Sequence, residues 1–113
     1  MSKLSKRQEE FTFALGLLII FAFSKGYKLT CGDAYRDPRV FGEYGEANGY
    51  GKICSVHKLR LAKDFNLRVR NKFIRSSKNK AWDELHLYWE SIGGAKRIRS
   101  DAGHFSFSWE GKR

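Results

Sequence analysis

The hydrophobic pattern of the chain predicts two helices separated by a region of short strands. The thirteen residues at 11–23 contain a single polar side chain, Thr12. A helix that is apolar on all sides is buried in a core or embedded in a membrane, and we expect residues 11–23 to form a buried core helix. Residues 81–92 carry apolar side chains at the spacing of one helical face, and the glycines at 93 and 94 end this second helix.

Short apolar runs elsewhere predict strands. Residues 27–31 follow a glycine helix stop, and residues 53–57 and 61–67 lie on either side of a bend. Near the C-terminus, aromatic residues at 105, 107 and 109 alternate with polar ones, which is typical of a half-buried strand. His104 enters this last strand, whereas His86 lies on the polar side of the second helix and is predicted to be a surface residue.

Two linking segments have distinctive compositions. Residues 40–52 are rich in glycine and predict a mobile loop of the kind that closes over a binding site. Residues 68–80 contain many lysines and arginines and no acid, which predicts a basic hairpin or loop with a solvated face.

Composition limits the class of protein. A chain of 113 residues, 42% of them hydrophobic, is expected to form a single domain spanning residues 1–113. Its 22 Lys+Arg against 12 Asp+Glu give a net charge of +10, which favours polyanionic surroundings such as nucleic acid or the envelope of a bacterium. Only 2 cysteines are present, so a disulfide-dense scaffold is excluded.

The N-terminal apolar run has a second interpretation. Basic residues before it and small residues after it resemble a secretory signal. However, Glu9 and Glu10 adjoin the run, and at 1.5 Å per residue it spans about 20 Å, short of the roughly 30 Å hydrocarbon core. We therefore favour a core helix without an export signal, with a signal or membrane anchor as the alternative.

Candidate metal chemistry lies in the middle and near the end of the chain. Two histidines and one aspartate are the ligand set of a catalytic zinc, and we predict that His57, Asp64 and His104 bind Zn²⁺. Asp101 is the candidate general base for the water at the open position. On one helix His57 and Asp64 would lie about 10 Å apart, and on one strand more than about 20 Å. The chain must therefore fold back between them if both bind one metal.

Neighbouring residues are expected to support these ligands. Ser55 is placed to form a hydrogen bond near the site, and Asn66 follows Asp64 on the same strand face. Cys54 is an alternative metal ligand, although we favour a cysteine that packs as a small apolar residue. The two acids can also exchange roles, with Asp101 on the metal and Asp64 orienting a histidine.

These residues lie in motifs that resemble a known family. Ser-x-His-x6-Asp at 55–64 and Asp-x-x-His-Phe at 101–105 resemble the zinc peptidase family of D-alanyl-D-alanine carboxypeptidases and dipeptidases, particularly its L-alanyl-D-glutamate endopeptidase branch found in phage endolysins. The resemblance covers residues 11–107. It includes Gly-Tyr-Lys-Leu-Thr at 26–30, Gly-Asp-Ala-Tyr-Arg-Asp-Pro-Arg at 32–39 and Tyr-Trp-Glu-Ser-Ile-Gly-Gly at 88–94. Each motif alone is weak, but their order and spacing together are specific.

The resemblance implies both a fold and an activity. The fold is α+β, with a small antiparallel sheet that carries the zinc site, flanked by the apolar N-terminal helix and the helix near 81–92. The activity is that of a metallopeptidase that cleaves peptidoglycan stem peptides, with Arg36 stabilising charge on the substrate carbonyl. The family commonly has glycine at the position of Arg60, and often Trp-Gly near residues 95–97, so this chain departs from the family pattern there.

Several alternatives remain at this stage. The bond cut is that of an L-alanyl-D-glutamate endopeptidase or of a D-alanyl-D-alanine carboxypeptidase. The first fits a monomeric phage or prophage endolysin, made in the bacterial cytoplasm and acting in the periplasm with electrostatic contact to the envelope. A basic module for nucleic acid or anionic lipid is another class, but residues 68–80 offer one stacking aromatic, Phe73, and no recognised motif, so no specific nucleic acid is expected. A third possibility is that this chain is a family member that kept zinc and lost activity. The presence of Asp101 disfavours it, because a structural zinc needs no neighbouring base.

Overall fold

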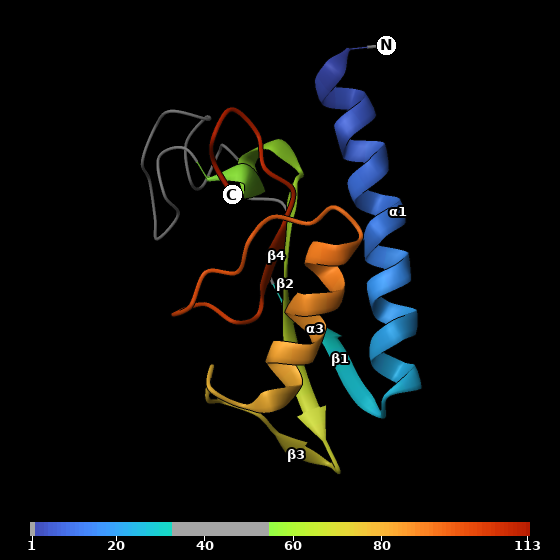
Figure 1. Ribbon diagram of the computed structural model, residues 1–113, viewed down its shortest axis with the longest axis vertical. Coiled ribbons are helices and arrows are strands. Elements are labelled where there is room, and N and C mark those ends of the chain that lie inside the picture. Colours follow the sequence, from blue (N-terminus) through green and yellow to red (C-terminus); the bar gives the residue numbers. More distant parts are fainter. Residues whose placement is uncertain (1, 33–54) are drawn as a thin grey trace.

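The computed structural model describes residues 2–32 and 55–113. In these ranges two helices and four strands form an α+β fold, and the strands make one small antiparallel sheet (Figure 1). This confirms the predicted fold class. Arg36, Cys54 and the predicted loop at 40–52 lie outside the described residues.

Helix α1 (Lys3–Ser24) begins at a capping residue and packs through one side. The Ser2 hydroxyl oxygen accepts the backbone N–H of Ser5 at 3.1 Å, which satisfies a donor of the first turn. Gly26 adopts φ +80°, a left-handed conformation that glycine tolerates, and turns the chain into the first strand. The core-facing side chains recur at helical spacing: Phe11, Ala14, Leu18 and Ala22.

The prediction that residues 11–23 form a buried core helix holds for one side of α1 only, because among the described residues nothing covers the other side. Phe13 and Ile20 are 71% and 70% exposed. They lie seven residues apart, so both point to the same outer side of the helix. Within the described ranges, no helix is long and apolar enough to cross a membrane.

Strand β2 (Ala62–Val69) is the centre of the sheet. It pairs antiparallel with β1 (Tyr27–Cys31), where Leu29 lies opposite Leu67. Its first residues also pair antiparallel with β4 (His104–Ser106). The central strand therefore joins β1, from the N-terminal part of the chain, to β4 near the C-terminus, and the strand predicted at 27–31 is confirmed.

Strand β3 (Lys72–Phe73) completes a hairpin with β2. The two turn residues, Arg70 and Asn71, both have positive φ, of 52° and 65°. Positive φ at both central residues is the mark of a tight two-residue hairpin turn. The basic segment is thus a hairpin followed by a loop, as its composition predicted.

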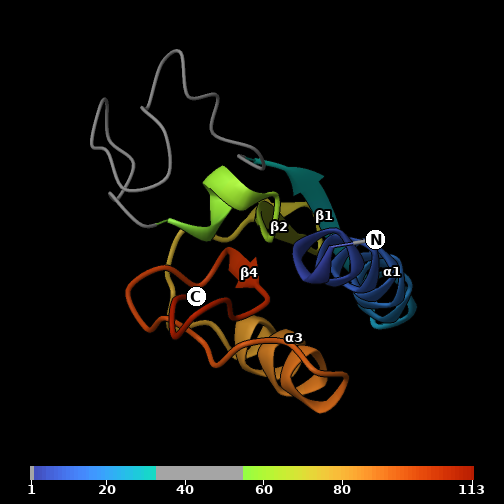
Figure 2. The same cartoon turned by 90° about the horizontal axis from the view of Figure 1, so that it is seen from above.

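Helix α3 (Lys80–Ser91) lies on the same side of the sheet as α1 (Figure 2). The Asn79 side chain accepts the backbone N–H of Ala81 at 2.9 Å and caps the helix. Trp89 is fully buried, and the Phe11 ring of α1 packs edge-on against it at 5.9 Å. The two helices thus share one aromatic core, and the predicted second helix is confirmed.

His86 of α3 is buried, so its predicted surface position is wrong. It is 2% exposed, its Nε2–H donates to the carbonyl oxygen of Ala102 at 2.6 Å, and its ring stacks on Phe105 at 4.1 Å. The chain that follows α3 returns across this side of the helix, so the helix is covered beyond its apolar stripe. Burial lowers the pKa of His86 to about 4, despite the opposing effect of the Ala102 hydrogen bond.

Two strand predictions are also corrected. Residues 56–59, predicted partly as the end of a strand, form the 3-10 helix Val56–Leu59. The C-terminal strand is shorter than predicted, and Ser106 is buried instead of exposed. The Ser106 carbonyl oxygen accepts the indole N–H of Trp89 at 2.9 Å and the backbone N–H of Ala95 at 2.8 Å, so β4 is enclosed between β2 and the α3 side.

Candidate metal centre

His57 is positioned by a tight turn that leads into β2. The Ser55 hydroxyl oxygen caps the 3-10 helix by accepting the backbone N–H of His57 at 3.2 Å. Arg60 then adopts φ 57°, and the backbone N–H of Leu61 donates to the carbonyl oxygen of Val56 at 3.0 Å. This reversal is the fold-back that one shared metal requires, and it uses a left-handed residue where glycine is favoured.

Asp64 and His104 face each other across the β2–β4 pair. The backbone N–H of Phe65 donates to the carbonyl oxygen of Gly103 at 2.9 Å, so Phe65 and Gly103, the next pair along the ladder, are the hydrogen-bonded pair. Asp64 and His104 are then a non-hydrogen-bonded pair, the kind whose side chains lie closest together on one face. Strand register therefore brings two of the three ligands together.

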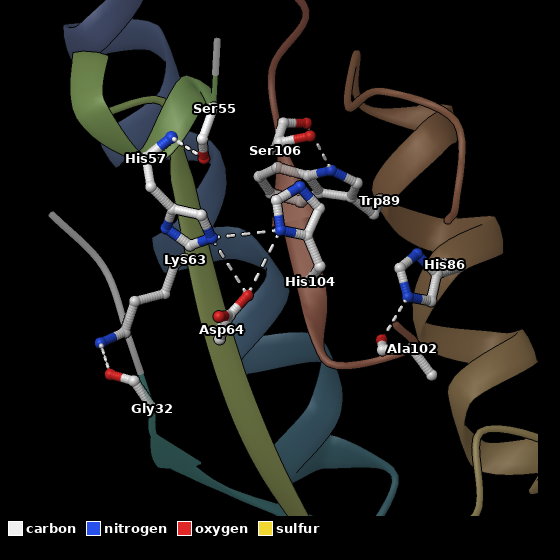
Figure 3. Close-up of polar contacts among 10 residues, drawn as sticks. All are labelled: Gly32, Ser55, His57, Lys63, Asp64, His86, Trp89, Ala102, His104 and Ser106. Carbon is white, nitrogen blue, oxygen red and sulfur yellow. Dashed lines mark hydrogen bonds and ion pairs between the residues drawn. The ribbon is translucent and has the colours of Figure 1, made fainter. Parts of the chain in front are cut away.

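The three predicted ligands converge on one point (Figure 3). His57 Nε2 lies 3.2 Å from His104 Nδ1, and Asp64 Oδ1 lies 3.3 Å from each of these nitrogens. A tetrahedral zinc with bonds of about 2.0–2.1 Å requires ligand atoms about 3.3–3.4 Å apart. The separations in this group match that requirement.

Hydrogen bonds alone do not explain this arrangement. The three atoms make three mutual contacts, but the ionised Asp64 oxygen carries no hydrogen and each ring nitrogen carries at most one, so at most two of the contacts are hydrogen bonds at one time. A single cation at the centre satisfies the lone pairs of all three atoms. The group can therefore hold a metal ion, and its two nitrogens and one oxygen are a donor set that zinc accepts.

The protonation state of Asp64 suits a metal ligand. Burial raises the pKa of its carboxyl, but hydrogen bonds from His104 and His57, together with the charges of these histidines, outweigh burial and hold the pKa well below its ordinary value. Asp64 is thus an anion at neutral pH. His57 and His104 are only 1% and 7% exposed, so their orientation is fixed by packing.

Asp101 lies beside this group and is not part of it. Its carbonyl oxygen accepts the backbone N–H of His104 at 3.1 Å, and its backbone N–H donates to the carbonyl oxygen of Ile98 at 3.0 Å. These two hydrogen bonds fix the turn before β4. Its exposed side chain lines a cavity of about 370 Å³, and Asp64 also lines this cavity. Asp101 therefore borders the same space as Asp64, a predicted ligand.

The predicted supporting residues have different outcomes. Ser55 positions His57 through its backbone, as described above. Asn66 is exposed on the Asp64 face and lines the same cavity, but no hydrogen bond joins Asn66 to Asp64. Arg36, the residue expected to stabilise the substrate carbonyl, and Cys54, the alternative ligand, stay outside the described ranges.

Gly103 and the hairpin arm are site features that the sequence did not reveal. A Cβ on Gly103 would lie 2.5 Å from the carbonyl oxygen of Phe65, so only glycine allows β4 to approach β2 beside His104. Phe73 and Arg75 line the cavity, although composition indicated only a basic segment. Their placement depends on the β2–β3 register, which one sequence does not specify.

Comparison with known proteins gives no further assignment. No protein-family model matches the chain, and no curated protein matches it. The resemblance to zinc peptidases therefore stays a prediction.

Proposed function

We propose that this protein is a zinc metallopeptidase that cleaves peptidoglycan stem peptides. The observation that carries the proposal is the convergence of His57 Nε2, Asp64 Oδ1 and His104 Nδ1 at 3.2–3.3 Å, beside a cavity lined by Asp101. A structural zinc is normally closed by four protein ligands, whereas a catalytic zinc has three and an open position. Among the described residues the group has three ligands and lies next to a cavity, which supports the catalytic type.

His57, Asp64 and His104 would hold the zinc. When bound there, Zn²⁺ polarises a carbonyl and lowers the pKa of its water towards 7. Asp101 lines the cavity from the turn before β4, where it can accept a proton from a water and pass it to the leaving amine. Ser55 and the Asp64–His104 strand pair keep the ligands in place before substrate arrives.

The substrate class is the more specific part of the proposal. The motifs at 55–64 and 101–105 resemble the peptidoglycan peptidases, and the L-alanyl-D-glutamate bond is the favoured target. The net charge of +10 suits an enzyme that works on an anionic cell wall. The role fits an endolysin that acts in the periplasm as a monomer.

The test is digestion of purified peptidoglycan followed by mass spectrometry of the released muropeptides. Metal-free protein should be inactive, and one equivalent of Zn²⁺ should restore cleavage at a single type of peptide bond. New ends at L-alanine and D-glutamate identify the endopeptidase, and loss of a terminal D-alanine identifies the carboxypeptidase. Intact peptides after zinc loading would contradict the proposed function.

Two variants separate catalysis from metal binding. Asp101→Asn should keep zinc content and folding but lower cleavage by about 10²–10⁴, the usual contribution of a positioned proton acceptor. Asp64→Asn should lose zinc affinity and activity together, because it removes the anionic ligand. If Asp101→Asn lost zinc while Asp64→Asn kept it, the roles of the two acids would be reversed.

A further inference from the structure

The open face of the sheet extends the candidate site towards the basic hairpin. The β2–β3 pairing continues past β3, because the backbone N–H of Ile74 donates to the carbonyl oxygen of Leu67 at 2.8 Å. In that register Arg75 lies opposite Asn66. Side chains alternate along a strand, so Asn66 shares a face with Asp64, about 7 Å further along β2. Arg75 therefore belongs to the same face as the metal ligand.

These residues line one space. The cavity of about 370 Å³ has Asp64, Asp101 and Arg75 as its ionisable lining residues within the described ranges. Asp64 is a predicted ligand and Asp101 the candidate base, so both acids have roles in bond cleavage. Among the described residues Arg75 is the one cation in this lining, and bond cleavage as proposed does not use it.

The guanidinium of Arg75 is oriented but not neutralised. It lies 5.2 Å from the centre of the Phe73 ring, a cation–π contact that holds it against the hairpin. Among the described residues, no acidic side chain forms an ion pair with Arg75. By contrast, Arg97 of the neighbouring loop pairs with Asp83. Within the described part of the chain, Arg75 thus presents a planar fork of donors without an acidic partner, and this fork has the geometry that matches a carboxylate.

We propose that Arg75 binds a free carboxylate of the substrate, on the residue next to the cleaved bond. This inference rests on the proposed function and names the group that selects its substrate. One extended residue spans about 3.5 Å, so an anionic group one or two residues from the scissile carbonyl is within reach of Arg75. With a divalent metal bound, positive charge in the cavity exceeds that of its two carboxylates, which also favours an anionic peptide.

The carboxylate has two chemical sources. It belongs either to an acidic residue within the peptide or to the C-terminal residue of the chain. Two pairs of synthetic peptides distinguish them, one with an internal glutamate as free acid or amide, the other with a C-terminal acid or amide. The pair in which amidation reduces cleavage more identifies the source.

The decisive variant is Arg75→Ala, with Lys72→Ala as the matched control. Lys72 is an exposed cation of the same hairpin and does not line the cavity. Arg75→Ala should lower kcat/KM for the acid peptide by about 10–100-fold, the loss expected for a charged hydrogen-bonded pair, and change the amide peptide less than about threefold. The kcat/KM of Arg75→Lys for the acid peptide should lie between those of the wild type and Arg75→Ala, because lysine keeps the charge but lacks the planar pair of donors. Lys72→Ala should leave the acid-to-amide ratio unchanged.

Calorimetric binding of the uncleavable product fragments provides a readout without catalysis. Wild-type protein should bind the acid fragment more tightly than its amide, and Arg75→Ala should abolish this preference at equal zinc content. If the preference exists but no peptide is cleaved, the subsite stands and the proposed function falls. If peptides are cleaved and Arg75→Ala keeps the acid preference, the subsite is wrong and the peptidase stands.

Discussion

His57, His86 and His104 are all buried, yet their surroundings give them different roles. His57 and His104 turn a ring nitrogen towards Asp64, whereas His86 turns its Nε2–H to a backbone carbonyl oxygen. Residue types and spacing were enough to predict that the first two lie together with Asp64, in a group that could hold a metal ion. They were not enough for His86, because its burial depends on the return of residues 95–103 across α3.

His86 makes stability depend on pH in a predictable direction. Its pKa is about 4 in the folded protein against an ordinary 6.5, so above pH 6.5 the side chain is neutral in both states. Between pH 6.5 and 4 the unfolded chain binds a proton that the native protein does not. The free energy of unfolding should therefore fall as the pH falls through this window, by on the order of 3 kcal/mol in total.

Urea unfolding of His86→Gln with a chelator present tests this. Glutamine keeps an N–H near the Ala102 oxygen but does not titrate, and carboxylate effects are common to both proteins. The variant should lose less stability than the wild type between pH 6.5 and 4.5. Parallel curves for the two proteins would show that His86 does not cause the pH dependence.

At the level of elements, the helices and β1 follow from local pattern. The apolar spacing of residues 81–92 and the capping Asn79 are visible in the sequence, and the glycine stop before Tyr27 marks the start of β1. The Val56–Leu59 turn and the short β4 are different, because tertiary contacts form them. Arg60 occupies a left-handed position, at a place where the resembled family commonly has glycine. Gly103 allows a close approach that is not apparent without the partner strand.

Substitution of Gly103 tests whether the close approach of β4 to β2 positions the predicted metal ligands. Gly103→Ala places a Cβ against the Phe65 carbonyl oxygen, at a distance of 2.5 Å before any shift. We expect β4 to move away from β2, which should cost about 1–3 kcal/mol of unfolding free energy and weaken zinc binding because His104 is the next residue. Denaturant unfolding and competition with a zinc chelator measure the two effects.

The matched substitution is Gly16→Ala in α1. Gly16 is exposed, and a Cβ there meets nothing within 4 Å. Gly16→Ala should raise the free energy of unfolding by about 0.5–1 kcal/mol, because alanine has the higher helix propensity, and it should leave zinc affinity unchanged. Normal zinc binding by Gly103→Ala would show that the β2–β4 approach does not position His104.

At the level of the whole molecule, the net charge of +10 is a property of the entire surface, whereas the predicted ligands form one local group. The two are therefore expected to affect binding to the cell wall differently. We predict that binding to purified peptidoglycan weakens with salt, because exposed charges are screened over about 8–10 Å at 0.1–0.15 M ionic strength. Pelleting with peptidoglycan across a salt series measures this, and salt-independent binding would point to a specific pocket instead.

The ligand group also has a mechanical consequence. Asp64 and His104 are 40 residues apart, and His57 and His104 are 47 apart, so one bound ion closes a long loop of the chain. The free energy of metal binding then adds to the free energy of folding, by about 4 kcal/mol when free zinc is 1,000 times its Kd. Without the ion, the three-residue β4 is held to β2 by a few backbone hydrogen bonds and by the buried Phe105 ring, which packs against Phe65. A metal ion bound to this group would therefore also protect the C-terminal segment from proteases, since the same ion would fasten that segment to the sheet.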